Sequence, residues 1–406
     1  MKRLLRNIHL YLALAAGLVI MNSCITGAIM VFEDDIDMAI HKERYFVEPQ
    51  GQRKSLQEIS RLAGQAVPKG KFAALKLYSD PRRSVEVAFM LPEAKGKEGE
   101  RVGSRPAQRS EAGPRKGKEE AAGKKKGKPG LFVYVNPYTG TVLDVYNKRE
   151  SFFFTVERLH RWLLGGNASP GKIIVGLSTC SFLIITITGI ILWWPKNKKI
   201  LLQRLKFKMN GSFKRMNHDL HVVAGFYTSI FLLVIILTGL VMSYTWVNKS
   251  IFTLTKSNPE SPEPPSSLYQ PGIKTINYDQ AFAALQPELK QAEYATLRMP
   301  KDSVGVYAIS ILPLQAADMA LDTYYIDQYA GKQVGQLLFK DKNTGQTIRA
   351  YVKPIHTGAI YGFPTKLFNF ILALVTFSFP ITGVIMWLNR IKKKKKKPLV
   401  KAASIL

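Results

Sequence analysis

Four stretches of the chain are continuously apolar over the length of a membrane-spanning helix. We predict these helices at residues 10–32, 171–194, 220–246 and 366–388. Each reaches the roughly 20 residues that a helix needs to cross a hydrocarbon core of about 30 Å. Serine, threonine and glycine occur inside them, but almost no charged residue does. The pattern therefore predicts an α-helical membrane protein with four transmembrane helices.

The two long regions between spans, 33–170 and 247–365, show the mixed pattern of small α+β modules. Residues 132–146 and 323–337 each read as a strand, a tight turn with glycine and a second strand. A further strand pattern, "RSVEVAFML" or "GVYAISIL", precedes each hairpin, and helix patterns begin at Ser55 and Asn277. We therefore expect one α+β module in each region.

The spans also repeat one another. In the first and third spans a histidine stands 17 residues before a Thr-Gly pair: His9 and Thr26, His221 and Thr238. The second and fourth spans share a longer spacing of 28 and 26 residues: His160 and Thr188, His356 and Thr382. Self-similarity of this kind predicts an internal duplication of the unit helix, outer module, helix.

The repeat divides the chain into eight segments. They are a basic terminus with the first span (1–32), a first module (33–155) with a disordered Lys/Gly/Glu-rich insert (93–130), a histidine-bearing segment with the second span (156–195), a basic loop (196–218), the third span (219–246), an extended linker with the second module (247–352), a histidine-bearing segment with the fourth span (353–389) and a basic tail (390–406).

Charge orients the predicted spans. The chain carries 58 Lys and Arg against 29 Asp and Glu, a formal net charge of +29. Basic residues gather before the first span, in the loop 196–218 and after the fourth span. These segments share one side if the spans alternate, and the positive-inside rule makes that side the cytoplasm. Because the lysine run 392–397 adjoins a span, we expect no nucleic-acid partner.

The first span is expected to be retained rather than removed as a signal peptide, because its apolar run continues through "ITGAIMVF" and it has a counterpart later in the chain. Cys24 and Cys180 both lie within spans, so neither a disulfide framework nor a cysteine-based metal site is expected.

Four of the six histidines occupy matched positions. His9 and His221 stand at the cytoplasmic starts of the first and third spans, and His160 and His356 on the outer approaches to the second and fourth. Neutral imidazole ligates iron, copper or zinc without placing a charge among membrane helices. Two histidines at one depth can ligate haem iron from both faces, which favours electron transfer because no iron position stays open. His218, one turn before His221, is an alternative inner ligand.

Simpler interpretations remain for the same residues. Any one histidine can face lipid headgroups or cap a helix, and a zinc or copper site is a further alternative, although no Cys or carboxylate cluster accompanies the histidines. We interpret the Thr-Gly pairs as close helix packing, and Gly17 and Gly225 as places where a flat ring approaches the backbone. No Gly-rich dinucleotide fingerprint is present, so NAD(P)H binding is not expected.

Several motifs together resemble the PepSY-associated transmembrane helix family of bacterial inner-membrane proteins. They are "LHRWLLGG", "ITGIILWWP", "DLHVVAGF", "IHTGAIYGF" and the "NPYTG" turn, and the resemblance covers nearly the whole chain. It implies PepSY-like outer modules and a role in iron acquisition, because some members are implied to be haem-bearing reductases of ferric siderophores. It also implies an outer haem between His160 and His356, and an inner haem between His9 and His221.

We therefore predict an inner-membrane oxidoreductase with two haem b groups and with both termini in the cytoplasm. It would accept electrons from a cytoplasmic or quinol donor and reduce a ferric siderophore or other ferric chelate in the periplasm. The alternative is a non-enzymatic, membrane-anchored PepSY protein that acts as a sensor or regulates a peptidase.

Overall fold

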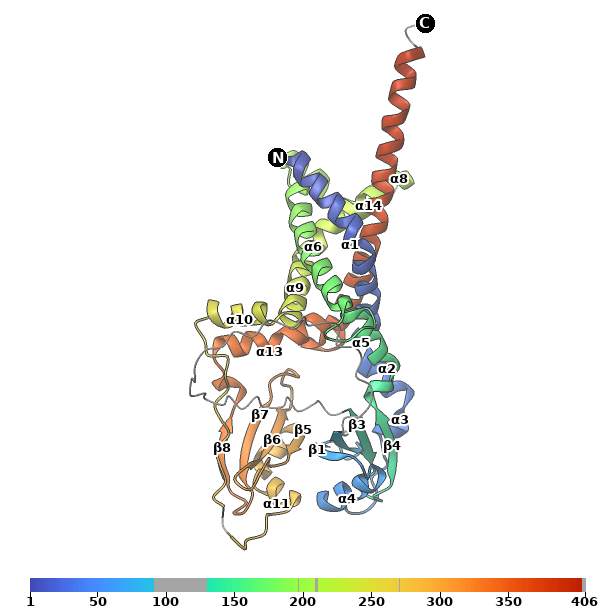
Figure 1. Cartoon of the computed structure of the whole chain (residues 1–406). Coiled ribbons are helices and arrows are strands. Elements are labelled where there is room, and N and C mark those ends of the chain that lie inside the picture. Colours follow the sequence, from blue (N-terminus) through green and yellow to red (C-terminus); the bar gives the residue numbers. More distant parts are fainter. Residues whose placement is uncertain (91–129, 196, 209–210, 270, 404–406) are drawn as a thin grey trace, which may run out of the picture.

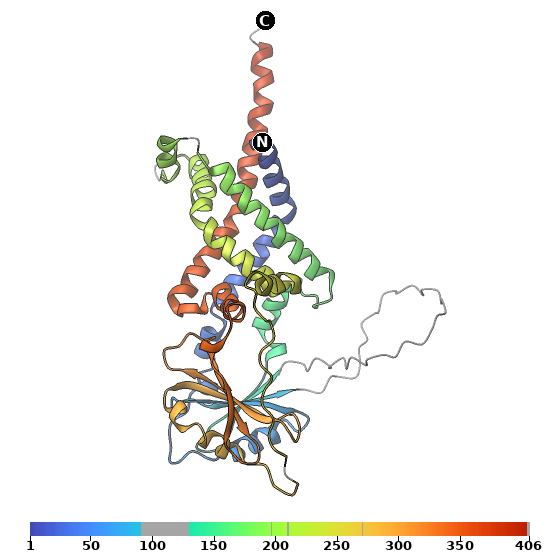
Figure 2. The same cartoon turned by 90° about the vertical axis from the view of Figure 1, so that its left-hand side faces the viewer.

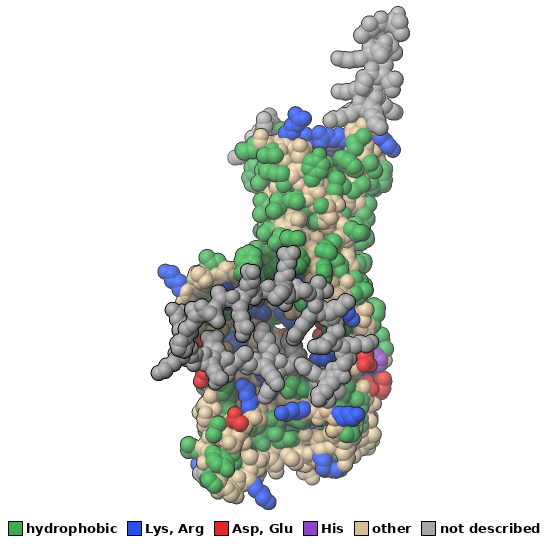
Figure 3. Space-filling view, in the orientation of Figure 1, with side chains coloured by type: hydrophobic (Ala, Val, Ile, Leu, Met, Phe, Trp, Pro, Cys, Tyr) green, Lys and Arg blue, Asp and Glu red, His purple; other side chains and the backbone are tan. Residues whose placement is uncertain are grey.

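The computed structural model describes residues 1–90, 130–195, 197–208, 211–269 and 271–403. A bundle of long helices stands on a β-sheet domain, and both chain ends lie at the end of the bundle away from the sheet (Figure 1). We call this end the basic end, because Lys and Arg side chains gather there (Figure 3), and the opposite end the sheet end. Nearly all of the predicted insert 93–130 lies outside the described residues.

Four helical segments are long and apolar enough to cross a membrane, as predicted: Lys2–Val31, Pro170–Trp193, Phe213–Ser243 and Phe363–Lys392. They correspond to α1 (Lys2–Val31), α6 (Pro170–Trp193), the continuous run of α8 (Phe213–Asp219), η2 (Leu220–Ala224) and α9 (Gly225–Ser243), and α14 (Phe363–Ala403). The first and third begin earlier than predicted, because Lys, Arg and other good helix formers extend the helices beyond their apolar parts.

The outside of the bundle is apolar and its inside is comparatively polar. Leu18, Leu177 and Ile230 are 80%, 62% and 64% exposed, whereas Thr26 and Thr382 are 2% and 5% exposed. Figure 3 shows the same apolar surface around the upper part of the molecule. An apolar exterior of this length suits a surrounding of hydrocarbon. The bundle is therefore a multi-pass membrane domain with a lipid bilayer around it.

One antiparallel sheet of eight strands forms the second domain. The strand order is β4-β3-β2-β1-β5-β6-β7-β8. The strands are β1 (Lys71–Tyr78), β2 (Val85–Met90), β3 (Leu131–Val135), β4 (Val142–Asn147), β5 (Ala292–Arg298), β6 (Val306–Pro313), β7 (Asp322–Asp327) and β8 (Gln333–Leu337). Both predicted hairpins are present, with the turn glycines Gly140 and Gly331 at φ +78° and +67°.

The two expected modules share this sheet instead of standing apart. The strands at its centre, β1 and β5, pair with each other, with Leu75 opposite Leu297 and Tyr78 opposite Tyr294. Sequence analysis missed both strands, since "KFAALKLY" and "AEYATLR" hold few of the β-branched residues that mark strands. The pairing between halves is a long-range contact that neither segment encodes alone.

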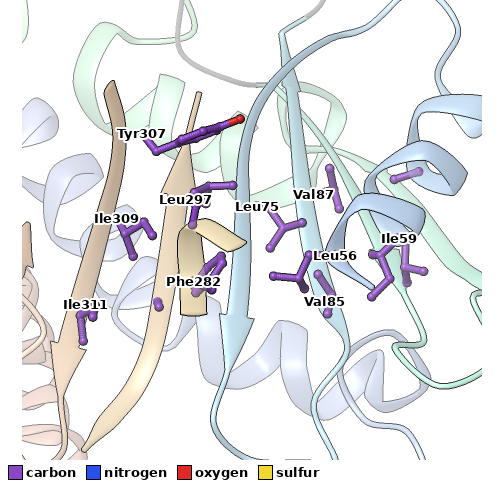
Figure 4. Packing of buried hydrophobic residues seen from close by; sticks show 14 of the residues in the cluster. Leu56, Ile59, Leu75, Val85, Val87, Phe282, Leu297, Tyr307, Ile309 and Ile311 are labelled. Atoms are coloured by element: carbon purple, nitrogen blue, oxygen red, sulfur yellow. The ribbon is translucent and has the colours of Figure 1, made fainter. Parts of the chain in front are cut away.

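The core of this domain lies on one face of the sheet. There β1, β2, β5 and β6 pack on α4 (Leu56–Ala66), α11 (Tyr278–Ala283) and α12 (Gln286–Lys290), as Figure 4 shows for several of these elements. Leu75, Leu297 and Ile309 are 0% exposed, and burying a side chain of this size contributes about 1.5–3 kcal/mol. The helix expected from Asn277 is split in two, because Pro287 cannot continue a preceding helix.

Two short helices join the sheet to the bundle. α5 (Phe152–Trp162) leads from β4 to α6, and α13 (Thr344–Thr357) leads from β8 to α14. α13 lies across the sheet end of the bundle beside α10 (Thr245–Leu254) (Figures 1 and 2). The remaining helices are α2 (Glu33–Ile40), α3 (Lys42–Tyr45), α7 (Lys198–Arg204), η1 (Lys148–Glu150), η3 (Phe339–Asp341) and η4 (Ala359–Tyr361). Cys24 and Cys180 are both free.

Candidate functional site

Four histidines meet as two pairs inside the molecule. The basic-end pair is His9 of α1 and His221 of η2, with ring centroids 6.3 Å apart and ring planes at 79°. The sheet-end pair is His160 of α5 and His356 of α13, with centroids 6.4 Å apart and planes at 72°. These are the two pairings expected from the sequence, although spacing alone does not require the rings to meet.

Each histidine is held by a threonine from another helix of the same half of the chain. Its Nδ1 lies 2.9–3.1 Å from the threonine Oγ1 in all four cases: His9 with Thr188, His160 with Thr26, His221 with Thr382 and His356 with Thr238. The exchange is reciprocal, since α1 supplies His9 to α6 and receives His160 from α5, which leads into α6. The second half repeats this exchange. His221 of η2 binds Thr382 of α14, and His356 of α13 binds Thr238 of α9.

The hydrogen bonds of these threonines fix which ring nitrogen carries the proton. Each hydroxyl already donates to the carbonyl four residues earlier in its own helix, as in Thr26 to Asn22 (2.6 Å) and Thr188 to Ile184 (2.7 Å). A hydroxyl has one proton to donate, so it accepts from the imidazole, and Nδ1 carries the hydrogen. Nε2 then keeps its lone pair, which is the state of a metal-ligating imidazole.

Backbone carbonyls support the same assignment in both pairs. The carbonyl oxygens of Ile185 and Ile235 lie 3.0 Å and 3.1 Å from Nδ1 of His9 and His356, and a carbonyl can only accept. Across the described part of the chain, no hydrogen bond engages Nε2 of the four histidines. All four side chains are half-buried, so some ring surface remains accessible between the helices.

A glycine follows each threonine, and at two of the four positions it makes room for the ring. A Cβ on Gly239 or Gly383 would lie only 3.2 Å from Cε1 of the bound histidine, whereas on Gly27 or Gly189 it would lie at an ordinary contact distance of 3.5 Å or 3.4 Å. The Thr-Gly pairs, interpreted from the sequence as helix packing alone, therefore have a second role. The threonine orients an imidazole, and Gly239 and Gly383 leave space for the ring that a methyl group would occupy.

Irregular backbone accompanies three of the four histidines. His221 lies within the single π-helical turn Leu220–Ala224, a feature frequent at functional sites. Three residues after His160, α5 ends at Leu163, and both Leu163 and Leu164 have positive φ, 49° and 68°. Left-handed backbone costs a non-glycine residue roughly 1–2 kcal/mol. α13 ends two residues after His356 at Gly358, with φ +77°, where glycine adopts this backbone without strain.

A cavity of about 930 Å³ adjoins the basic-end pair. His9 and His221 line it, together with Gly17 and Gly225, the glycines proposed for close ring approach. His218 lines it too, but its side chain is 49% exposed and its Nδ1 lies 3.3 Å from Oδ1 of Asp219. The ring that meets His9 is therefore that of His221.

The two pairs lie at different depths of the bundle. Thr26, which holds His160, follows His9 on the same helix by 17 residues, a rise of about 26 Å at about 1.5 Å per residue. This separation approaches the thickness of a hydrocarbon core, about 30 Å. One pair thus lies near each face of the membrane domain.

The sheet-end histidines are held neutral. Burial, reinforced by the neighbouring His356, lowers the pKa of His160 to about 4, and burial also lowers the pKa of His356. Both imidazoles are therefore uncharged at neutral pH. His41, which like His218 has no matched position, forms side-chain hydrogen bonds only with Asp37 among the described residues.

The donor set fits a metal held between two imidazoles. A metal bound about 2.0–2.1 Å from one nitrogen of each ring would separate the ring centroids by roughly 6 Å, close to the 6.3 Å and 6.4 Å of the two pairs. Edge-to-face ring pairs cover the same range, so the informative feature is that Nδ1 of every ring is bound by threonine while Nε2 has no hydrogen-bond partner among the described residues. Within the described residues no group of three or more His, Cys, Asp or Glu could hold a metal. Two imidazoles alone would suit a metal whose other ligands come from a macrocycle, such as haem.

Comparison with protein-family models identifies a family. The family model described as the PepSY-associated TM region matches residues 6–390, nearly the whole chain. A search of the curated proteins finds no match.

Proposed function

The chain belongs to the PepSY-associated TM region family, and we propose that it is a membrane oxidoreductase that carries electrons between the two faces of a bacterial inner membrane. His9 and His221 would hold one haem b, and His160 and His356 a second. The basic end would face the cytoplasm under the positive-inside rule, and the sheet domain the periplasm. The acceptor would be a ferric siderophore or another ferric chelate.

One observation carries this proposal. At two depths about 26 Å apart, two imidazole rings lie 6.3–6.4 Å apart between centroids, with Nδ1 hydrogen-bonded to threonine and with no hydrogen-bond partner for Nε2 in the described part of the chain. A structural histidine pair needs no such matched orientation at both ends of a bundle. An orienting partner on the second ring nitrogen is typical of histidine ligands.

The residues around each pair have distinct roles. Haem iron with two imidazole ligands supplies one-electron chemistry and leaves no open position for oxygen. The threonines fix the tautomer and the orientation of the rings, and the glycines allow the rings to approach the helices closely. The imidazoles stay neutral, which avoids the cost of a charge among membrane helices.

The direction of transfer follows from the proposed orientation. A reduced flavin or a quinol on the cytoplasmic side would give up one electron per ferric ion, and the chelated Fe(III) would become Fe(II) on the sheet side. Oxygen-rich chelators suit the harder Fe(III), so reduction weakens the complex and releases iron for uptake.

We further propose that the chain arose by internal duplication and that each half of its sheet is a PepSY-like module. The matched strand order about the β1–β5 junction and the reciprocal histidine exchange in each half support this. In this view the duplication created two ligand pairs, because each half contributes one histidine to each pair.

Proteoliposomes test the proposed function. The purified chain is reconstituted with a reductant sealed inside, and a ferric chelate is added outside with a coloured Fe(II) indicator. We expect Fe(II) outside only where the protein is present, together with reduced haem bands in the visible spectrum. A colourless, folded protein would favour the non-enzymatic sensor or peptidase regulator. A coloured protein that leaves external iron ferric would contradict the proposed acceptor.

A further inference from the structure

The cavity at the basic-end pair opens among arginines and lysines. Arg3 and Arg6 of α1, Arg204 of α7, Lys208, Arg215 of α8 and Arg390 of α14 all line it. The one acidic residue among its described lining residues, Asp219, is 1% exposed and accepts from Arg215 (3.0 Å) and from the backbone N–H of Lys208 (3.1 Å). The remaining cations have no carboxylate within ion-pair distance in the described part of the chain.

The cavity is also lined by a tryptophan whose buried N–H group has no hydrogen-bond partner among the described residues. Trp193 lines the cavity, is 4% exposed and stacks on Phe226 with ring centroids 3.5 Å apart. Its indole Nε1 is buried and has no hydrogen-bond partner among the described residues. A buried N–H left unpaired costs about 1–3 kcal/mol, so this atom favours an acceptor supplied by a ligand.

Arg204 stands beside this donor. One of its Nη atoms donates to the backbone carbonyl of Trp193, and the guanidinium carries further N–H groups in a fork that matches carboxylate or phosphate. Trp193 follows Gly189 by four residues or about 6 Å of helix, and a Cβ added to Gly189 would lie 3.4 Å from Cε1 of His9. Arg6 precedes His9 by three residues, about 4.5 Å. The cationic and neutral donors therefore lie within about one turn of the histidine pair.

Topology alone does not account for this arrangement. The positive-inside rule calls for basic residues in the loops beside a span, and Lys206, which does not line the cavity, satisfies it equally well. The rule gives no reason for a half-buried arginine next to an unpaired indole N–H inside a cavity.

We propose that the mouth of this cavity is a binding site for a carboxylate or phosphate group, with Arg204 and Arg6 as charged donors and Trp193 Nε1 as a neutral donor. Two sources carry this chemistry: the carboxylates of the tetrapyrrole in the basic-end site, and the phosphate of a diffusible flavin donor. Only the first source rests on the proposed haem function.

The test compares probes that differ only in their anion. The full-length protein in nanodiscs of zwitterionic lipid is titrated with flavin mononucleotide and with riboflavin, followed by tryptophan fluorescence. Protein produced without haem is titrated with haem and with haem dimethyl ester, followed by absorbance. The variants are R204Q and R6Q, with K206Q as the matched loss of one charge from the same segment, and W193F, which keeps the ring stack but removes the N–H.

We expect wild-type protein to prefer the anionic member of at least one probe pair by about 10-fold or more. R204Q should abolish that preference, R6Q and W193F should reduce it, and K206Q should leave it unchanged. A preference for haem over its ester assigns the site to the tetrapyrrole carboxylates, and one for flavin mononucleotide assigns it to a donor phosphate.

Equal binding within both probe pairs would overturn the anion site, as would an R204Q variant that behaves like K206Q. These results are separable from a failure of the haem proposal. If no haem binds but flavin mononucleotide is still preferred, the anion site stands and the haem proposal fails. If haem and its ester bind equally and flavin shows no preference, the haem proposal stands and the anion site fails.

Discussion

The basic-end pair and the sheet-end pair have similar ring geometry and the same threonine contacts, but they are supported by different parts of the structure. His9 and His221 lie on helices that themselves span the membrane domain, whereas His160 and His356 lie on α5 and α13, which connect that domain to the sheet. The basic-end pair should therefore depend on the bundle alone. The sheet-end pair should depend on the bundle through Thr26 and Thr238 and on the sheet through its connecting helices.

Removing a ligand should give the largest effect and the clearest separation of the pairs. We expect H160A and H356A each to lose one of two haems and to reduce external ferric chelate at background rate. H9A and H221A should lose the other haem. Haem content and Fe(II) production are measured on the same preparations, with H41A as the control. Full haem content in both H160A and H356A would show that the sheet-end pair is not a ligand pair.

Weakening the β1–β5 junction should distinguish the two kinds of support. We expect L75A or L297A to destabilise the sheet by about 2–5 kcal/mol, since both side chains are 0% exposed. Combined with H9A, which leaves only the sheet-end haem, the change should lower the temperature at which haem is released. Combined with H160A, which leaves only the basic-end haem, it should have little effect. If the haem-release temperature fell equally in the H9A and H160A backgrounds, the two histidine pairs would not be supported independently.

Removing an orienting hydroxyl should have an intermediate effect at either pair. T188V and T26V delete the acceptor for Nδ1 of His9 and His160, which we expect to weaken haem retention by about 10–100-fold. T188S and T26S should restore it because they keep the hydroxyl. T179V is the control, since Thr179 donates to Val175 in its own helix and contacts no histidine. Unchanged affinity and reduction potential in both valine variants would show that the tautomer needs no threonine.

Filling the glycine positions should have the smallest effect, and an uneven one. G239A and G383A place a methyl group 3.2 Å from Cε1 of His356 and His221, and we expect a cost of about 1–3 kcal/mol from overpacking. G27A and G189A, at 3.5 Å and 3.4 Å, should be milder. G64A is the control, because Gly64 lies in α4 of the sheet domain, does not line the cavity and has nothing within 4 Å of an added Cβ. The measurement is the temperature at which each variant releases haem. If G239A and G383A released haem at no lower temperature than G27A and G189A, the close approach of the rings to these glycines would be contradicted.

The sequence predicted the parts of this molecule that depend on local or strictly periodic signals. The lengths of the apolar stretches predicted four spans, and the turn glycines predicted two hairpins. The repeated spacing predicted that His9 pairs with His221 and His160 with His356. The partners of the histidines did not follow. Thr188 holds His9 across 179 residues of sequence, and a Thr-Gly pair inside an apolar helix looks the same whether it packs against a helix or an imidazole.

The continuous sheet was also beyond local reasoning. Its central pairing, Leu75 with Leu297, joins two segments that each carry a weak strand pattern, and their stability comes from mutual burial. The basic mouth of the cavity was interpreted from sequence purely as a topology signal. The proposed anion binding at this mouth also depends on Trp193, whose ring stacks on Phe226 and whose buried Nε1 has no hydrogen-bond partner among the described residues. A count of charges does not reveal such an atom.

The haem content of the purified wild-type chain tests the central claim most directly. Haem released into alkaline pyridine is quantified by its reduced α band and divided by the protein concentration from amino-acid analysis. Two matched histidine pairs predict two haem b groups per chain, with the low-spin spectrum of bis-histidine ligation. A folded chain that binds no haem when produced with ample iron and haem would contradict the assignment of both pairs.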